Sequence, residues 1–176
     1  MHIILETPRL ILRRFTATDE DAALLLQLNS DPEVIKYLHE PLLQNSSQAR
    51  HILDTVILPQ YDLNLGRLAI HLKENGRFIG WCGLKFRAEL QETDLGYRLQ
   101  KKCWGHGYAT EAAGASLEYG FEMLALQRIT GRAHVDNASS LSVLRKIGMK
   151  YLRDEIIDNS PVKTFEALNH SPEFIA

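Results

Sequence analysis

Residues 105–121, with the sequence GHGYATEAAGASLEYGF, place two glycines directly before a helical pattern. Apolar residues recur there at steps of three and four, which predicts a helix with one buried face. The residues just before this helix, KKCWGHG, include no Ser, Thr, Asp or Asn, the usual partners of the free N–H groups in a first helical turn. These N–H groups need another partner, and a bound ligand can supply it.

The same loop has the properties of an anion-binding site. Gly105 and Gly107 let the backbone approach a ligand closely, and the helix dipole places partial positive charge at this end. Lys101 and Lys102 add full positive charges just upstream. The alternative is that the two glycines only shape a turn, because an isolated GxG pattern is common. Both interpretations stay open at this point.

Two familiar phosphate-binding motifs do not match the loop. A nucleotide P-loop continues with Lys and then Ser or Thr, whereas Gly107 is followed by Tyr108 and Ala109. A dinucleotide-binding GxGxxG motif needs a third glycine where Thr110 stands, and it belongs to an early βαβ unit. A phosphate bound here therefore points to a different fold.

The composition excludes several classes of partner. A chain of 176 residues with 45% hydrophobic and 24% charged residues is expected to form one soluble globular domain over residues 1–176. A formal net charge of −2 gives no overall attraction to nucleic acid, and no apolar run is long enough to span a membrane. The two cysteines and an amino-terminal sequence unlike a signal peptide favour the cytoplasm. The seven histidines show no ligand spacing, so no metal site is predicted.

Residue patterns predict an alternation of strands and helices. Period-two patterns bounded by turn residues predict strands at 9–15, 67–73, 77–84, 93–99, 128–135, 149–157 and 162–168. Helices are predicted after Thr18, from Asp31-Pro32 through Leu38, from a cap at Ser47 to a point before Pro59, from the glycine-rich loop onward, and from Asn137 or Ser139 through Lys146. Asn75-Gly76 predicts a tight hairpin turn, and a second turn is predicted at 158–161. The order predicts an α/β mixed sheet with helices on both faces.

Three blocks of this sequence, taken together, resemble one known family. DLGYRL, then KKCWGHGYATEA, then RITGRAHVDNASSLSVLRKIGM are similar in order and spacing to the GNAT N-acetyltransferases, in particular to their RimJ/RimL-like branch. The opening LETPRLILRRF resembles the first strand of that family. The resemblance implies a GNAT-like fold with a central, mostly antiparallel, splayed sheet, and it implies an acetyl-CoA-dependent N-acetyltransferase.

The resemblance also implies where acetyl-CoA binds. Its pyrophosphate would lie on the main-chain N–H groups of the glycine-rich loop, and its pantetheine arm would pair with the exposed edge of the strand at 93–99. Lys102 stands where the family commonly has Arg or Gln, a small departure because the main chain does most of the binding. The cofactor-binding residues implied are Tyr97, Leu99, Lys102, Gly105, His106, Gly107, Tyr108, Ala109, Thr110 and Asn137.

The chemistry of acetyl transfer requires an acceptor for the ammonium proton. Asp94 matches the position where the family often carries Glu, and it shares a strand face with Gly96. A side chain one methylene shorter than Glu favours a relaying water. Glu92, one alternation earlier, is the second candidate base, and a solvated acid at a strand start is the structural alternative for Asp94. A backbone N–H near Tyr97 would polarise the thioester carbonyl.

The departing thiolate needs a hydrogen-bond donor. Many GNAT enzymes place a Tyr at the position that is Leu144 here. The resemblance to the RimJ/RimL-like pattern N-x-x-S-x-x-V-L-x-K-x-G implies instead that Ser140 hydrogen-bonds the CoA sulfur, while Asn137 holds the pantetheine amide. The alternative is that Asn137 or Ser139 only caps the helix, although both roles can coexist.

The acceptor amine is the part that the sequence leaves open. The resemblance implies a primary amine, first of all a protein N-terminal α-amine, with a small amine such as a polyamine or aminoglycoside as the alternative. A non-catalytic acyl-CoA-binding or sensing domain is a third interpretation, and a monomer or homodimer is expected. The groove for the acceptor would be built by the helices near 19–63 and the last hairpin, which carry no matching motif.

Overall fold

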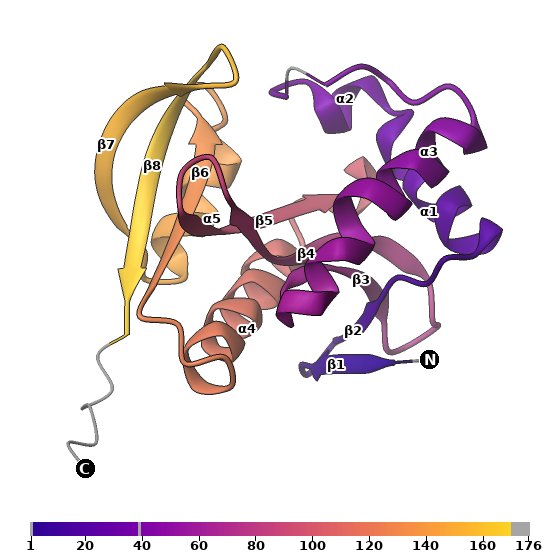
Figure 1. Cartoon of the computed structure of the whole chain (residues 1–176), viewed down its shortest axis with the longest axis horizontal. Helices are drawn as coiled ribbons and strands as arrows, with labels where there is room; N and C mark the ends of the chain where they lie inside the picture. Colours follow the sequence, from indigo (N-terminus) through magenta and orange to yellow (C-terminus); the bar gives the residue numbers. More distant parts are fainter. Residues whose placement is uncertain (1, 39, 170–176) are drawn as a thin grey trace.

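The computed structural model describes residues 2–38 and 40–169, and they form one eight-stranded sheet with helices on both faces (Figure 1). The strand order is β1-β2-β3-β4-β5-β6-β8-β7. Every neighbouring pair is antiparallel except β5 and β6, which run parallel. The strands are β1 (Ile3–Glu6), β2 (Leu10–Arg14), β3 (Gly66–Leu72), β4 (Phe78–Arg87), β5 (Glu92–Leu99), β6 (Arg128–His134), β7 (Lys150–Ile157) and β8 (Ser160–Leu168).

The helices form two layers, one on each face of this sheet. One layer holds α4 (Tyr108–Glu122) and α5 (Ala138–Lys146), and the other is dominated by α1 (Asp19–Asn29) and α3 (Ser46–Ile52). The short α2 (Pro32–Ile35), the π-helical η1 (Leu53–Ile57) and the 3-10 helices η2 (Leu58–Leu63) and η3 (Lys101–Cys103) complete the set. The predicted mixed sheet with helices on both faces is confirmed. Of the helices in the described part of the chain, none is long and apolar enough to cross a membrane.

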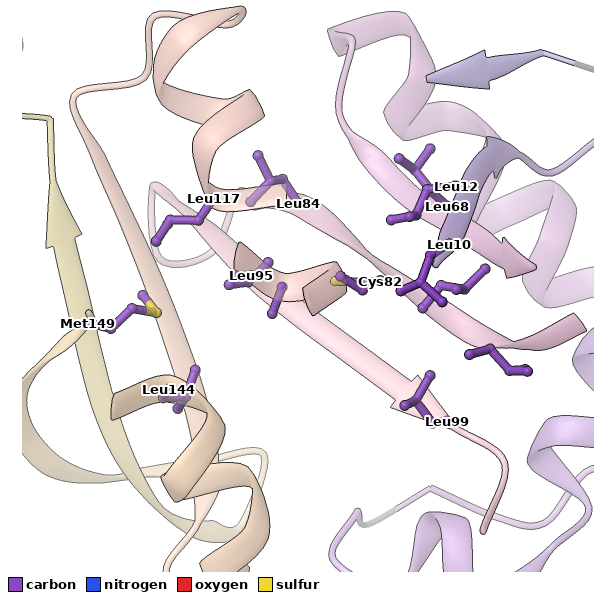
Figure 2. Close-up of a cluster of buried hydrophobic side chains, with 14 of the residues drawn as sticks. Leu10, Leu12, Leu68, Cys82, Leu84, Leu95, Leu99, Leu117, Leu144 and Met149 are labelled. Atoms are coloured by element: carbon purple, nitrogen blue, oxygen red, sulfur yellow. The ribbon is translucent and has the colours of Figure 1, made fainter. Parts of the chain in front are cut away.

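The cores on the two faces differ in size. The larger core, between the sheet and α4 and α5, includes Leu84, Leu95, Leu117 and Leu144 (Figure 2). The smaller core packs α1, α3 and η1 on the opposite face around Trp81. Burying this apolar area on both faces holds β4 and β5 at the centre of the molecule.

Several local predictions were wrong in detail. Asn45, and not Ser47, caps α3, because its side chain accepts the N–H of Gln48. The helix does end before Pro59 as predicted, since α3 ends at Ile52 and η1 at Ile57, and a separate 3-10 turn, η2, follows with Pro59 in its first turn, where a missing N–H costs nothing. The β3–β4 connection is a five-residue loop, residues 73–77, in which the N–H of Gly76 donates to the carbonyl of Leu72. Strand β1 was not predicted.

The sheet comes apart between its two central strands. Only Asp94 with Thr130 and Leu95 with Gly131 are paired between β5 and β6, although β5 continues to Leu99. Beyond Leu95 the edge of β5 that faces β6 therefore has no strand partner. This confirms the predicted splay, and it exposes backbone N–H and C=O groups in the middle of the sheet.

Candidate active site

The glycine-rich loop delivers α4 with an uncapped amino terminus. Gly107 is the N-cap residue, in the left-handed region with φ of 78°, and within the described residues no side chain caps the first-turn N–H groups of α4. The first turn closes with the N–H of Glu111 on the carbonyl of Gly107, at 3.0 Å. A side chain added at Gly105, also at φ 78°, would point into open space. The opening of the loop is thus free for a ligand.

Arg9 and Glu111 hold this loop in place through hydrogen bonds. Arg9 Nε donates to Glu111 Oε2 at 2.6 Å, and Arg9 Nη1 donates to the carbonyl of His106 at 2.9 Å. The hydroxyl of Thr7 donates to the other oxygen of Glu111 at 2.6 Å. The Arg9 guanidinium also lies 4.6 Å from the ring centroid of Tyr108. Partial burial raises the pKa of Glu111, but the hydrogen bonds from Thr7 and Arg9 outweigh it and lower the pKa below the ordinary value.

The other loop residues are placed as follows. Lys102 is exposed, and His106 is exposed with its ring stacked on Tyr108. The indole of Trp104 donates to the carbonyl of Leu99 at 2.9 Å, which ties the loop to the end of β5. Ala109 and Thr110 lie half-buried in the first turn of α4. The structure thus brings the predicted loop residues together around one helix end.

The start of α5 lies opposite the free edge of β5. Asn137 caps α5 by accepting the N–H of Ser140 at 3.1 Å, which confirms the capping role. The hydroxyl of Tyr97 donates to the carbonyl of Ser140 at 3.1 Å, and burial raises the pKa of this phenol to about 12. The Ser140 hydroxyl itself has no partner among the described residues and is half-buried. It is available to a ligand between β5 and α5.

Together these features fit an elongated anionic ligand such as acetyl-CoA. The first-turn N–H groups of α4 can receive a diphosphate, and the free edge of β5 can pair with an extended amide-containing arm. Tyr97 and Leu99 contribute backbone to that edge, while their side chains pack in the larger core. The fit rests on main-chain groups, which agrees with the absence of a bulky side chain at Gly105 and Gly107.

The face of the sheet that packs on α1 and α3 carries a set of charged side chains. We refer to Arg67, Lys85, Glu92, Asp94, Arg98 and Arg132 as the charged face; they alternate along β3 to β6 with the residues of the larger core. Asp94 lies opposite Lys85 on β4 and beside Thr130 on β6, one pair before the last β5–β6 pair, Leu95 with Gly131. Asp94, the predicted base, thus lies where β5 and β6 begin to separate.

Asp94 and Glu92 share one cation, but their pKa values are shifted in opposite directions. Arg132, only 6% exposed, donates to Asp94 Oδ1 at 2.8 Å, to Glu155 Oε1 at 3.1 Å and also to Glu92. Burial raises the pKa of Asp94 and outweighs the lowering by Arg132. Burial also acts to raise the pKa of Glu92, but hydrogen bonds to Arg132 and Arg128 lower it below the ordinary value. When the surroundings shift the pKa values of two neighbouring carboxylates in opposite directions, the carboxylate with the raised pKa is the better proton acceptor.

Sequence reasoning missed Arg9, Glu111 and Arg132. Arg9 stood in the block LETPRLILRRF, and its charge directly before a strand was the available signal. The position of Arg132 beside Asp94 could not be predicted, because it depends on how β6 pairs with β5 and β8, which are distant in the sequence. Within residues 2–38 and 40–169, no group of His, Cys, Asp and Glu side chains is arranged to hold a metal ion. Cys82 and Cys103 are both buried and free.

Comparison with known proteins agrees with this geometry. A family model described as an acetyltransferase (GNAT) domain matches residues 9–150. The uncharacterized N-acetyltransferase p20 of Bacillus licheniformis is 34% identical over 147 residues, which cover 83% of this chain and 82% of that protein.

Two solved structures share the fold. RimL, the ribosomal L7/L12 alpha-N-protein acetyltransferase in complex with coenzyme A, superposes with a TM-score of 0.80 at 17% identity, covering 95% of this chain and 98% of RimL. Spermidine N-acetyltransferase from Vibrio cholerae, in complex with CoA and spermine, gives a TM-score of 0.76 at 16% identity, covering 93% and 97% of the two chains. The family match and the p20 relative carry the assignment, and these structures support the fold: the chain belongs to the GNAT acetyltransferase family and is an acetyl-CoA-dependent N-acetyltransferase.

Proposed function

We propose that this protein, acting as a single domain in the cytoplasm, acetylates protein N-terminal α-amines as a member of the RimJ/RimL-like branch. The observation that supports the proposal most is the position of Asp94. This carboxylate has a raised pKa, lies at the point where β5 leaves β6, and faces away from the glycine-rich loop's side of the sheet. An amine that approaches from the charged face meets this base beside the free edge of β5.

In the proposed reaction, bound acetyl-CoA supplies the acetyl group as a thioester. Asp94 accepts, through a water, the proton that the ammonium group loses, and the neutral nitrogen then forms a bond to the acetyl carbon. The carbon–sulfur bond breaks with its electron pair on sulfur, and the nitrogen, now bonded to the acetyl carbon, releases its second proton to solvent to give the neutral amide. Ser140 donates a hydrogen bond to this sulfur, and a solvent proton converts it to the thiol. A backbone N–H of β5 near Tyr97 donates to the thioester oxygen.

The proposed binding residues follow from the described geometry. The main chain from Gly105 to Thr110 would hold the diphosphate at the start of α4, with Lys102 adding charge. The backbone at Tyr97 and Leu99 would hold the pantetheine arm on one side, and Asn137 at the start of α5 on the other. Because Asn137 Oδ1 already caps α5, its amide nitrogen is the group that remains for the ligand.

The test is release of free thiol from acetyl-CoA with a panel of amines. The panel holds short peptides with free N-termini, the same peptides with blocked N-termini and one lysine, and spermidine. We expect turnover with free N-terminal peptides and little with the blocked series. Turnover with spermidine alone would replace the proposed acceptor class. Tight CoA binding with no turnover on any amine would instead identify a binding or sensing domain.

A further inference from the structure

Two cations of the charged face have no carboxylate partner among the described residues. Arg87, Arg98, Arg128 and Arg132 each make an ion pair with a carboxylate. Arg67 and Lys85 make no hydrogen bond or ion pair with any residue in the ranges 2–38 and 40–169, although both are only partly exposed. A half-buried charge without a partner is unfavourable, so its retention calls for a compensating group.

Arg67 is held in a fixed orientation. Its guanidinium lies 4.4 Å from the ring centroid of Trp81, which is 5% exposed, and Arg98 lies 5.4 Å from the same ring. Such stacking fixes the plane of the guanidinium and leaves its N–H groups at the edge free to donate. Burial first, and then the neighbouring Arg98, lower the pKa of Arg67 to about 10, while Glu40 and Asp94 act in the opposite direction. Arg67 stays charged at neutral pH.

The strand register places both cations beside the proposed base. Lys85 is directly opposite Asp94 across β4 and β5. Arg67 is in line with Gly83 and Gly96, so no side chain of β4 or β5 intervenes in that row. Neighbouring strands are about 4.8 Å apart, so an anion between Lys85 and Arg67 would lie roughly 5–10 Å from Asp94. One to three residues of extended peptide, or one small molecule, span that distance.

We propose that the acceptor carries an anionic group, a carboxylate or a phosphate, close to its amine, and that Arg67 with Lys85 binds this group. This inference rests on the proposed function and narrows its substrate class. The planar guanidinium of Arg67 offers a bidentate pair of donors, which suits both oxyanions. A polyamine, which is cationic along its length, would be repelled by the two unpaired charges.

The substrate test uses peptides that differ only in the second residue. The sequences are Ala-Glu, Ala-Gln, Ala-phosphoserine and Ala-Lys at the start of one peptide, so the reacting amine is the same in all of them. Free glutamate and glutamine form a second pair, which separates a peptide side chain from a small amino acid as the source of the anion. We expect kcat/KM to be at least about tenfold higher for the anionic member of one pair, with the difference mainly in KM. Ratios near one in both pairs overturn the inference.

The variants test which residues are responsible. Arg67→Gln and, independently, Lys85→Gln should each reduce the Glu-to-Gln ratio at least threefold and leave the Ala-Gln peptide nearly unchanged. The matched control is Arg77→Gln, which removes an exposed arginine from the β3–β4 loop and should keep the wild-type ratio. Equal losses on both peptides would assign Arg67 to packing on Trp81 and overturn the inference, and thermal melts of both variants identify folding defects.

Binding of the acetylated products separates this inference from the proposed function, because binding needs no turnover. Calorimetry on the CoA-saturated protein compares N-acetyl-Ala-Glu with N-acetyl-Ala-Gln peptides, and N-acetylglutamate with N-acetylglutamine. Tighter binding of an anionic member that Arg67→Gln removes supports the anion site even if no amine is acetylated. Equal affinities within both pairs would overturn it even in an active enzyme.

Discussion

The glycine-rich loop and the charged face lie on opposite sides of the same strand and are built from different chemical groups. The loop presents main-chain N–H groups, held by Arg9 and Glu111 from behind. The charged face presents side chains from β3 to β6, of which Arg132 pairs with Glu92 and Asp94 and Arg98 pairs with Glu40. The main-chain surface can bind one shared co-substrate, whatever the neighbouring side chains are. If the charged face binds the acceptor, as proposed, a few substitutions there can change the acceptor while the bound co-substrate stays the same.

The largest expected effect comes from breaking the main-chain surface. Gly107→Glu places a side chain and a negative charge at the start of α4, where φ is 78° and a Cβ would lie 3.5 Å from Arg9. We expect CoA affinity to fall by more than about 100-fold, because the new carboxylate opposes the positive end of the α4 dipole and its side chain blocks the diphosphate from the main-chain N–H groups. Isothermal calorimetry measures this loss.

Gly76→Glu is the matched control for that variant. Gly76 has a similar φ of 71° and open space around it, but it lies in the β3–β4 loop. It should bear the same backbone strain and leave CoA binding intact. Unchanged CoA affinity in a folded Gly107→Glu protein would show that the loop is not the diphosphate site.

The next effect tests the charged face. Asp94→Asn removes the proposed proton acceptor while Arg132 keeps Glu92 and Glu155 as partners. We expect kcat/KM near neutral pH to fall by roughly 10²–10³-fold, within the usual range for general-base catalysis. The loss should shrink at alkaline pH, where the amine deprotonates unaided, and a pH–rate profile measures it. A uniform loss at every pH would assign Asp94 a structural role.

A smaller effect is expected for Ser140→Ala. A thiolate leaving CoA has a pKa near that of free Cys, about 8.5, and needs only modest help. One hydrogen bond to a charged sulfur contributes about 1.5–3 kcal/mol, or about ten- to a hundred-fold in rate. Steady-state kinetics should show this loss in kcat with CoA affinity nearly unchanged. Because Asn137 still caps α5, the melting temperature should hold, and unchanged turnover would make Ser140 a packing residue.

The smallest expected effect is a difference between Glu92 and Asp94 in what each contributes to the free energy of unfolding. The pKa of Glu92 is lowered by folding, so its stabilisation is present above the unfolded pKa and is lost as pH falls through the folded value. The pKa of Asp94 is raised, so its stabilisation is present only at low pH and is lost as pH rises. At pH 7, urea unfolding should show that Glu92→Gln costs about 1–3 kcal/mol and Asp94→Asn costs none. The difference between the two variants in unfolding free energy should become smaller toward pH 4. A larger loss for Asp94→Asn than for Glu92→Gln at pH 7 would contradict the assignment of Asp94 as the base.

The parts of the fold that depend on local pattern could be predicted from the sequence. The alternation in RLAIHLK, the glycines before α4 and the turn at Asp158-Asn159, where both residues have positive φ, act over a few residues. The capping error at α3 arose because Asn45 and Ser47 are both good caps, and the Gln48 side chain bonded to Gln44 N–H helped to decide between them.

The side-chain surroundings of the site could not be predicted. The Arg9–Glu111 pair joins residues 102 positions apart, and the Arg132–Asp94 pair joins residues 38 apart. Whether Asp94 has a raised or a lowered pKa depends on which arginines of β6 face it, and only the strand register fixes that. The resemblance indicated Asp94 as a candidate, but its difference from Glu92 appears only in three dimensions.

The narrow junction between β5 and β6 also affects how the molecule withstands unfolding. Two residue pairs join β1–β5 to β6–β8 within the sheet, and the rest of the connection comes from the ion pairs of Arg132 with Glu92 and Asp94 and from the hydrophobic contacts of α4 and α5. A ligand lying in the seam would bridge both parts, and its binding energy would add to the stability of the folded chain as RT ln(1 + [L]/Kd). The lifetime of this enzyme against proteolysis would then follow the supply of its co-substrate.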